Sequence, residues 1–194
     1  MQNANIGCLV MAAGNAARYG ENKLAAKLNG KPLIRYALEA VPKELFSRVV
    51  VVTQYPEIEA MAGEFGFETI HNKHPDYGIS HTIALGTKAM SECSAILYLV
   101  SDQPLLDAAS VKRVVQCWRE HPCSIVGAAH NGKRGNPCIF PREFFDELLA
   151  LTEDHGGNSV IRCHPDRLLT VEFAQEELTD VDTPQALADL QTQR

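Results

Sequence analysis

The sequence lacks the features of a membrane protein, a secreted protein or a metal-thiolate scaffold. No apolar run approaches the roughly 20 residues that a membrane-spanning helix needs. The opening stretch, MQNANIGCLVMAAG, has no basic flank before its apolar run, so we do not expect a signal peptide. The six cysteines form no C-x-x-C pair, which disfavours a zinc site or a disulfide framework. We therefore expect a cytoplasmic protein that does not associate with membranes.

The chain also lacks the excess of basic residues that is typical of nucleic-acid-binding proteins. Its formal net charge is −6, which disfavours a nucleic-acid partner. The charge is locally reversed between Arg18 and Lys31, where four basic side chains accompany one acidic side chain. This segment is therefore a candidate site for an anion.

No linker, internal repeat or low-complexity tract interrupts the chain, so we expect residues 1–194 to form one domain. Short apolar runs alternate with segments of helical spacing, which indicates an α/β fold. We expect a Rossmann-like three-layer sandwich of the nucleotidyltransferase type, with a mostly parallel central sheet. The predicted strands lie at 6–11, 48–53, 67–72, 95–102, 123–129, 136–140 and 168–173, and the predicted helices at 32–41, 56–65, 80–90, 107–118, 142–151 and 183–191.

A glycine-bearing loop follows the first predicted strand, but neither common phosphate-binding motif is present. Gly14 and Gly20 fit neither G-x-G-x-x-G nor the P-loop pattern G-x-x-x-x-G-K-[ST]. Small residues at Ala12, Ala13 and Gly14 would let a base or phosphate approach the backbone closely. The alternative is a glycine-containing strand-to-helix turn with incidental lysines.

Three charged residues near this loop suit a nucleoside triphosphate. Arg18 and Lys23 offer a planar fork and a point charge to polyphosphate oxygens. Asp102 follows another buried strand and could hold Mg²⁺ between the protein and the phosphates. Because ligands of open α/β sheets bind at the carboxyl ends of strands, we expect the loop and Asp102 to face one crevice.

Five ordered segments of the chain resemble the molybdenum cofactor cytidylyltransferase family of the MobA-like NTP transferase superfamily. They are MAAGNAARYGENKL, PDYGISHTIALG, VSDQPLL, NGKRGNPCIFPREFFDELLAL and DVDTPQAL. The first resembles the signature L-x-A-G-x-S-x-R-x-G-x-x-K, and the third resembles G-D-Q-P-L-L. Together they span nearly the whole chain.

This resemblance implies transfer of CMP from CTP to the terminal phosphate of molybdopterin, with release of pyrophosphate. It implies Mg²⁺ as cofactor and a molybdenum hydroxylase apoenzyme as a further partner. The implied catalytic residues are Arg18, Lys23 and Asp102. The implied metal ligands are Asp102 with Asp180 or Asp182. The implied nucleotide-binding residues are Ala12, Ala13, Gly14, Arg18, Lys23, Ser80 and Thr82. The implied substrate-binding residues are Gln103, Pro104, Gly135, Asn136 and Pro137.

The choice of CTP depends on one small feature. Relatives that use CTP tend to carry A-A-G in the loop, whereas guanylyl-transferring relatives tend to carry G-G. Here Ala12, Ala13 and Gly14 match the first pattern, and an added methyl group would narrow the slot that a purine needs.

Three positions depart from the family pattern. Ala16 replaces the signature serine, His81 interrupts a serine run, and Asn158 stands where an arginine is usual. If that arginine grips the anionic substrate, this chain must bind a less charged acceptor or supply the cation elsewhere, with Lys133 and Arg134 as candidates.

Two alternatives therefore stay open. The chain could transfer a nucleotide from GTP, or to a sugar phosphate or polyol phosphate. It could also carry the molybdenum cofactor as a chaperone without catalysing a reaction.

Overall fold

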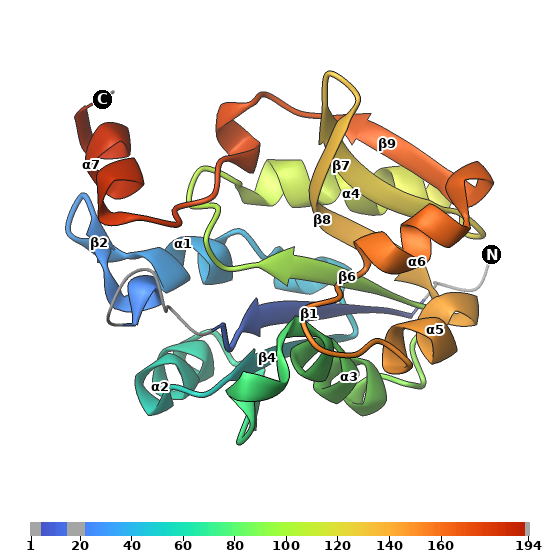
Figure 1. Cartoon of the computed structure of the whole chain (residues 1–194), viewed down its shortest axis with the longest axis horizontal. Helices are drawn as coiled ribbons and strands as arrows, with labels where there is room; N and C mark the ends of the chain where they lie inside the picture. The colour runs from blue at the N-terminus through green and yellow to red at the C-terminus, as the bar shows by residue number, and fades with distance from the viewer. Residues whose placement is uncertain (1–4, 15–21, 193–194) are drawn as a thin grey trace.

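The computed structural model describes residues 5–14 and 22–192, and its centre is a seven-stranded sheet (Figure 1). The strands lie in the order β5-β4-β1-β6-β8-β7-β9. Their bounds are β1 Ile6–Ala12, β4 Arg48–Thr53, β5 Glu68–His71, β6 Ala95–Val100, β7 Ile125–His130, β8 Lys133–Pro141 and β9 Leu168–Glu172.

Three adjacent inner strands, β4, β1 and β6, run parallel and are buried on both faces. This burial explains why their sequences are continuous apolar runs rather than alternating ones. Only β8 runs antiparallel to its neighbours β6 and β7. The predicted α/β fold with a mostly parallel central sheet is therefore confirmed.

The antiparallel strand arises from a tight hairpin that joins β7 to β8. Its two turn residues, Asn131 and Gly132, have φ angles of 49° and 77°. Asparagine and glycine tolerate positive φ better than other residues, and Asn-Gly favours two-residue hairpin turns. As a result β8 begins at Lys133, three residues earlier than the sequence predicts.

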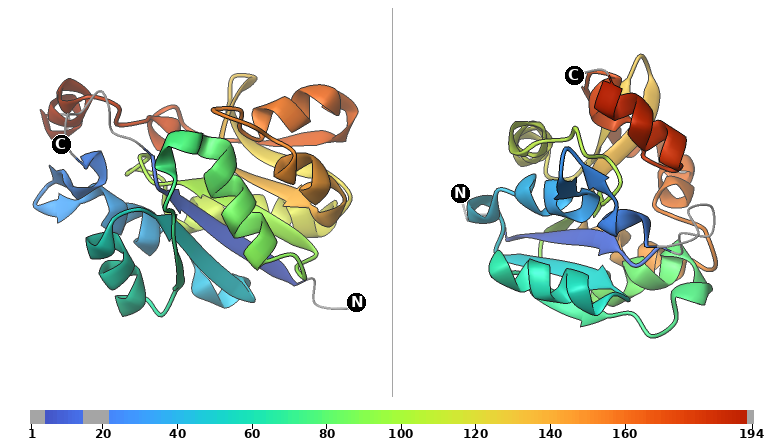
Figure 2. Two further views of the ribbon diagram at one scale, coloured as in Figure 1. Left: turned by 60° about the horizontal axis from the view of Figure 1, so that its bottom comes forward. Right: turned by 90° about the vertical axis from the view of Figure 1, so that its left-hand side faces the viewer.

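Helices cover both faces of the sheet (Figure 2). Side chains of α1, α2 and α4 pack in one apolar cluster with Cys8, Val10 and Val51, and those of α3, α5 and α6 pack in another with Leu9 and Val50. Successive residues of a strand point to opposite faces, which divides β1 and β4 between the two clusters. The helix bounds are α1 Leu33–Glu39, α2 Pro56–Glu64, α3 Ile79–Ala89, α4 Ala108–Glu120, α5 Phe145–Leu149 and α6 Asn158–Cys163.

A third, smaller cluster joins the two ends of the sequence. The short hairpin of β2 (Lys27–Leu28) and β3 (Lys31–Pro32) lies beside the last helix, α7 (Pro184–Thr192), in Figures 1 and 2. Leu28, Leu33 and Val181 are buried there, with Leu187 and Leu190 packed against them. This contact fixes the segment that precedes α7 next to the segment that follows the glycine-bearing loop.

Two elements were not predicted from the sequence: the β2–β3 hairpin and α6. Both are too short to show a clear hydrophobic period. Across residues 5–14 and 22–192, no helix is both long enough and apolar enough to cross a membrane.

Candidate active site

The carboxyl ends of β1 and β6 meet at one edge of the sheet. Met11 is paired with Val100, and the Ser101 hydroxyl donates a hydrogen bond of 2.9 Å to the Met11 carbonyl. The chain leaves β1 toward Gly14 and leaves β6 toward Asp102, so both segments emerge side by side. The expected crevice edge is present.

Lys23 lies at this edge and holds two carboxylates that are far apart in the sequence. Its Nζ is 2.7 Å from Asp102 Oδ2 and 2.9 Å from Asp182 Oδ1. Lys23 opens a single 3-10 turn, Lys23–Ala25, and the Asn22 side chain caps this turn by accepting from the Leu24 N–H. The sequence predicted all three residues as site residues, and the structure brings them together.

Burial alone would lower the pKa of the Lys23 ammonium, since it disfavours the charged form. The charges and hydrogen bonds of Asp102 and Asp182 outweigh this effect, so the pKa of Lys23 is raised. Lys23 is therefore fully charged at neutral pH.

A backbone contact explains why Asp182 reaches Asp102, although the two residues are 80 positions apart in the sequence. The Val181 N–H donates a hydrogen bond of 2.8 Å to the Asp102 carbonyl. The Val181 side chain is fully buried among Leu28 and Leu33. The third apolar cluster therefore positions the acidic group.

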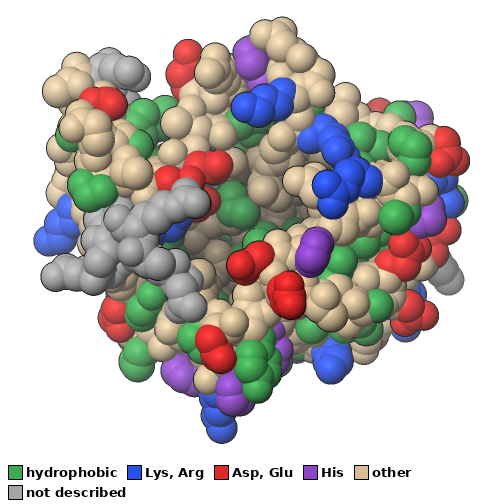
Figure 3. All heavy atoms as spheres, in the orientation of Figure 1, with side chains coloured by type: hydrophobic (Ala, Val, Ile, Leu, Met, Phe, Trp, Pro, Cys, Tyr) green, Lys and Arg blue, Asp and Glu red, His purple; other side chains and the backbone are tan. Residues whose placement is uncertain are grey.

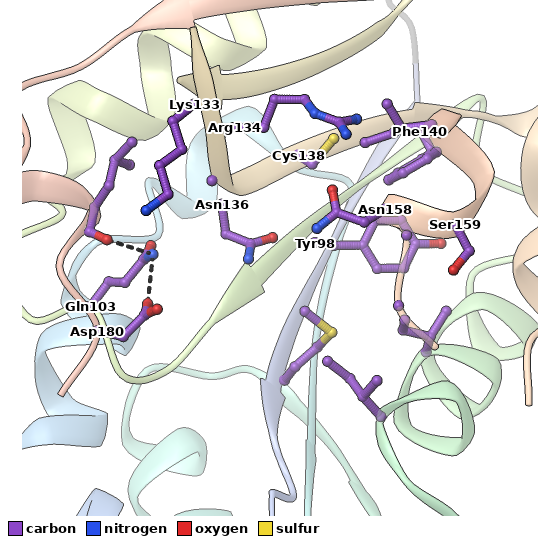
Figure 4. Close-up of a pocket in the computed structure, with 18 of the residues that line it drawn as sticks. Tyr98, Gln103, Lys133, Arg134, Asn136, Cys138, Phe140, Asn158, Ser159 and Asp180 are labelled. Carbon is purple, nitrogen blue, oxygen red and sulfur yellow. Dashed lines mark hydrogen bonds between the residues drawn. The ribbon is translucent and has the colours of Figure 1, made fainter. Parts of the chain in front are cut away.

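Asp180 points to Gln103 rather than to Lys23. The Gln103 amide Nε2 donates to Asp180 Oδ1 at 2.9 Å and to the Leu178 carbonyl at 3.4 Å (Figure 4). Partial desolvation raises the pKa of Asp180, and the negative charge of Asp102 raises it further. Of the two candidate partners of Asp102 in metal binding, Asp182 is the one that converges with it on a common cation.

The loop residues Ala12, Ala13 and Gly14 differ in their surroundings. The methyl groups of Ala12 and Ala13 are buried in the two main apolar clusters, whereas a side chain at Gly14 would meet open space. The Gln54 amide donates to the Ala13 carbonyl at 3.1 Å. The alanine methyls therefore do not line an open slot, and an influence on base choice would act through the backbone. Arg18 lies outside the described residues.

Ser80 and Thr82 lie in the first turn of α3, and their side chains face the protein. Both residues are 4% exposed. The Ser80 hydroxyl donates to the Tyr77 carbonyl, and the Thr82 hydroxyl accepts from the Asn72 amide, each at 3.4 Å. The predicted nucleotide-binding hydroxyls are thus engaged inside the fold in this conformation.

A cavity of about 960 Å³ opens beside the Lys23 cluster. Its lining includes Gln103 and Asp180 at one end and Asn158 and Arg162 on α6. Figure 3 shows the hollow from outside, with acidic side chains on its left and basic side chains over β8 and α6 at its upper right. A cavity of this size and polarity can hold a small polar molecule next to the Lys23 cluster.

The substrate-binding residues predicted from the resemblance are only partly in this cavity. Gln103, Gly135 and Asn136 line it, but Pro104 and Pro137 do not and are buried. Gly135 lies so close to Leu178 that an added Cβ would be 3.3 Å from its Cδ1. The prolines therefore shape the chain around the cavity rather than contact its contents.

Three further basic side chains line the cavity; the sequence analysis names Lys133 and Arg134 only as candidates to replace the missing cation, and it does not identify Arg162. Lys133 and Arg134 lie at the start of β8, and Arg162 lies one helical turn after Asn158 on α6. The Asn-Gly signal before Lys133 would have predicted the hairpin that carries two of them. Arg162 had no comparable signal. The cavity that Asn158 lines therefore contains three basic side chains from other positions.

The histidines and cysteines form no metal site in the part of the chain that the structure describes, where no three His, Cys, Asp or Glu side chains are grouped to hold an ion. His71 contacts Glu59 at 2.6 Å, and His74 stacks on Tyr77. Cys8, Cys93 and Cys138 are buried. Asp102 and Asp182 likewise have no third carboxylate, histidine or cysteine grouped with them among the described residues. A metal ion bound to these two carboxylates would therefore need further oxygen ligands from its substrate.

Comparison with known proteins connects these features to a family. One curated relative is a probable molybdenum cofactor guanylyltransferase from Pyrococcus horikoshii, 37% identical over 81 residues; the match covers 40% of this chain and only 42% of that relative. Another is the purine catabolism protein PucB from Bacillus subtilis, 25% identical over 188 residues and 90% of both chains.

A solved nucleotidyl transferase from Methanothermobacter has the same fold. The two chains superpose with a TM-score of 0.82 over 97% of each, at 21% sequence identity. The family model described as the MobA-like NTP transferase domain matches residues 8–170, which include most of β1, Lys23, Asp102 and the basic residues of the cavity. The chain therefore belongs to the MobA-like NTP transferase domain family.

Proposed function

We propose that this protein transfers CMP from CTP to the terminal phosphate of molybdopterin and releases pyrophosphate. A role in the molybdenum cofactor pathway is supported by the five sequence segments and by the name of the Pyrococcus relative, a probable molybdenum cofactor guanylyltransferase. The observation that carries the proposal is the Lys23, Asp102 and Asp182 cluster beside a cavity lined by three cations.

Lys23 would hold the triphosphate. Its ammonium lies beside Asp102, at the edge of the sheet where β1 and β6 end, and keeps its charge. A fixed positive charge stabilises phosphate oxygens as the bond to pyrophosphate breaks, and such positioning dominates nucleotidyl transfer. Arg18 is the second candidate for this role by sequence.

Asp102 and Asp182 fit a magnesium ion. They present hard carboxylate oxygens around one point, and Mg²⁺ is commonly bound by one or two carboxylates together with substrate phosphates. When bound, the ion would neutralise charge on the reacting phosphates. For this to occur, Lys23 must release at least one carboxylate and turn to the triphosphate.

The reaction needs no general base from the protein. The attacking group is a phosphate that is already ionised at neutral pH, so no proton has to be removed from it. The cavity residues would orient this phosphate in line with the departing pyrophosphate, and Gln103, which directly follows Asp102 in the chain, lines the end of the cavity nearest to it.

GTP is the competing nucleotide, since the Pyrococcus relative is named as a guanylyltransferase. The A-A-G loop favours CTP, but the methyl groups of Ala12 and Ala13 are buried rather than at an open slot. The decisive assay measures pyrophosphate release with Mg²⁺ and molybdenum-loaded molybdopterin, and compares CTP with GTP. Release with CTP alone supports the proposal, and release with GTP alone overturns its choice of base.

A carrier role is the second candidate, and delivery of the cofactor to a molybdenum hydroxylase apoenzyme is compatible with either. If neither CTP nor GTP gives pyrophosphate release but the protein still binds the molybdenum cofactor, the carrier role is favoured. In that case Asp102→Asn should leave binding unchanged, because a carrier has no step that requires this carboxylate.

A further inference from the structure

The cavity has two chemically different ends. Near Lys23 its lining contains Asp180 and Gln103, and farther along β8 and α6 it contains Arg134, Asn158 and Arg162. In Figure 4, Lys133 points toward Gln103 and Asp180, whereas Arg134 points the other way, toward Asn158. The basic side chains over β8 and α6 in Figure 3 border this second end.

The cations of the second end are not held by acidic partners. Among the described residues, Arg134 makes no side-chain hydrogen bond or ion pair, and Arg162 donates only to the Ser159 hydroxyl at 3.3 Å. Lys133, whose side chain points to the first end, is likewise unpaired among the described residues. By contrast, the arginines at 35, 48, 113 and 167 each pair with at least one carboxylate. Arg119 is also unpaired, but it lies on α4 and does not line the cavity.

Unpaired guanidinium groups that line a cavity in a protein of net charge −6 point to an anionic ligand. Guanidinium forks bind phosphate and other oxyanions through paired hydrogen bonds. The phosphate that attacks the nucleotide must lie at the other end, next to Asp102. The two sites cannot be filled by one small anion, because they lie at opposite ends of the cavity.

We propose that Arg134 and Arg162 form a second anion-binding site, which recognises an anionic group at the end of the acceptor remote from its reacting phosphate. The acceptor class is therefore a molecule with an anion at each end. This inference rests on the proposed function for the position of the reacting phosphate. It also explains how Asn158 is tolerated: Asn158 offers an amide, and the charge comes from β8 and from the next turn of α6.

The test compares two series of simple probes by isothermal titration calorimetry. One is α,ω-alkanediol bisphosphates of increasing chain length, and the other is the corresponding ω-hydroxyalkyl monophosphates. We expect one range of bisphosphate lengths to bind the wild-type protein at least tenfold more tightly than the matched monophosphates. The preference should persist in Lys23→Met, which removes the triphosphate cation and leaves the cavity intact.

Arg134→Gln and Arg162→Gln should each reduce this preference severalfold, and the double variant should abolish it. Arg134→Lys should restore part of it, since the charge returns without the planar fork. Arg119→Gln is the matched control and should leave it unchanged. Arg119, Arg134 and Arg162 are all exposed, so we expect folding to be preserved, and thermal melting checks this.

Equal affinity for bisphosphates and monophosphates, or an equal loss in Arg119→Gln, would overturn the proposal. Failure of the proposed function is distinguishable from this result, because it would appear as absent pyrophosphate release in the nucleotide assay. A bisphosphate preference without that release would leave the second anion site standing and require another acceptor.

Discussion

The two ends of the site handle charge in opposite ways. At the Lys23 end, a cation and two carboxylates satisfy one another, with separations of 2.7 and 2.9 Å. At the Arg134 and Arg162 end, the cations have no carboxylate partner in the described part of the chain. The first end would have to break an ion pair to accept the proposed metal ion and phosphates, whereas the second could accept an anion without breaking one. Changes at the two ends should therefore separate turnover from acceptor affinity.

The largest effect is expected from Asp102→Asn. This change keeps the shape of the side chain but removes the negative charge that Lys23 contacts and that the proposed magnesium ion would bind. We expect nucleotidyl transfer to fall about 10³-fold or more, as when a group that stabilises the transition state is lost. Pyrophosphate release measures the change. Asp146→Asn on α5 is the control, and equal losses in both variants would contradict a specific role for Asp102.

Lys23→Met should act in two opposite directions. Turnover should fall about 10²-fold or more, because a charge on the triphosphate is lost. In the absence of nucleotide, Mn²⁺ should bind more tightly, since Asp102 and Asp182 no longer hold an ammonium. Electron paramagnetic resonance of free Mn²⁺ gives this affinity. Lys112→Met, which removes an exposed partner of Glu44, is the control. Weaker Mn²⁺ binding in Lys23→Met would show that the ammonium does not compete with the ion.

Gly78→Ala should displace the segment that begins at Glu153 and continues into the cavity lining. Gly78 has a φ of 80°, and a Cβ there would be 2.4 Å from the Glu153 carbonyl oxygen. Because the neighbouring residues 154–157 line the cavity, we expect weaker acceptor binding and a loss of about 1–3 kcal/mol in unfolding free energy.

Gly63→Ala provides the contrast for Gly78→Ala. Gly63 lies inside α2 with open space around its Cβ position, so the change should stabilise the protein by about 0.5–1 kcal/mol. Urea denaturation measures both variants. An unchanged unfolding free energy in Gly78→Ala would mean that the segment after Glu153 moves to accommodate the added methyl group without a loss of stability.

The smallest effect concerns Asp107, which caps α4 after the turn that carries Asp102. Hydrogen bonding from the Ser110 N–H lowers the pKa of Asp107, and its carboxylate accepts this bond at 2.8 Å. Asp107→Ala should cost about 1 kcal/mol at pH 7. A lowered native pKa contributes stability above the unfolded pKa and loses it as the pH falls through the native one. The difference between the two proteins should therefore shrink below about pH 4, where the unfolded carboxyl titrates. A constant difference would contradict the charged cap.

Much of this site could be predicted from sequence because its parts follow buried strands. The apolar runs 6–11 and 95–100 identify two parallel strands, and chain topology then places Gly14 and Asp102 at one edge. Lys23 could be assigned because it lies in a recognisable segment after the first strand. Such features depend on local patterns and on the general rules of parallel sheets.

Which charged side chains come into contact depends on the tertiary structure and could not be predicted from local patterns. Asp182, not Asp180, joins Asp102 on Lys23, because burial of Val181 turns the chain at that point. Arg162 enters the cavity because the short helix α6 docks on the sheet, and a six-residue helix has too little period to be recognised in a sequence. Local sequence patterns were enough to predict the fold class, the edge of the sheet at which the site lies and the family of the chain. The convergence of the charges came from long-range packing, which no local pattern encodes.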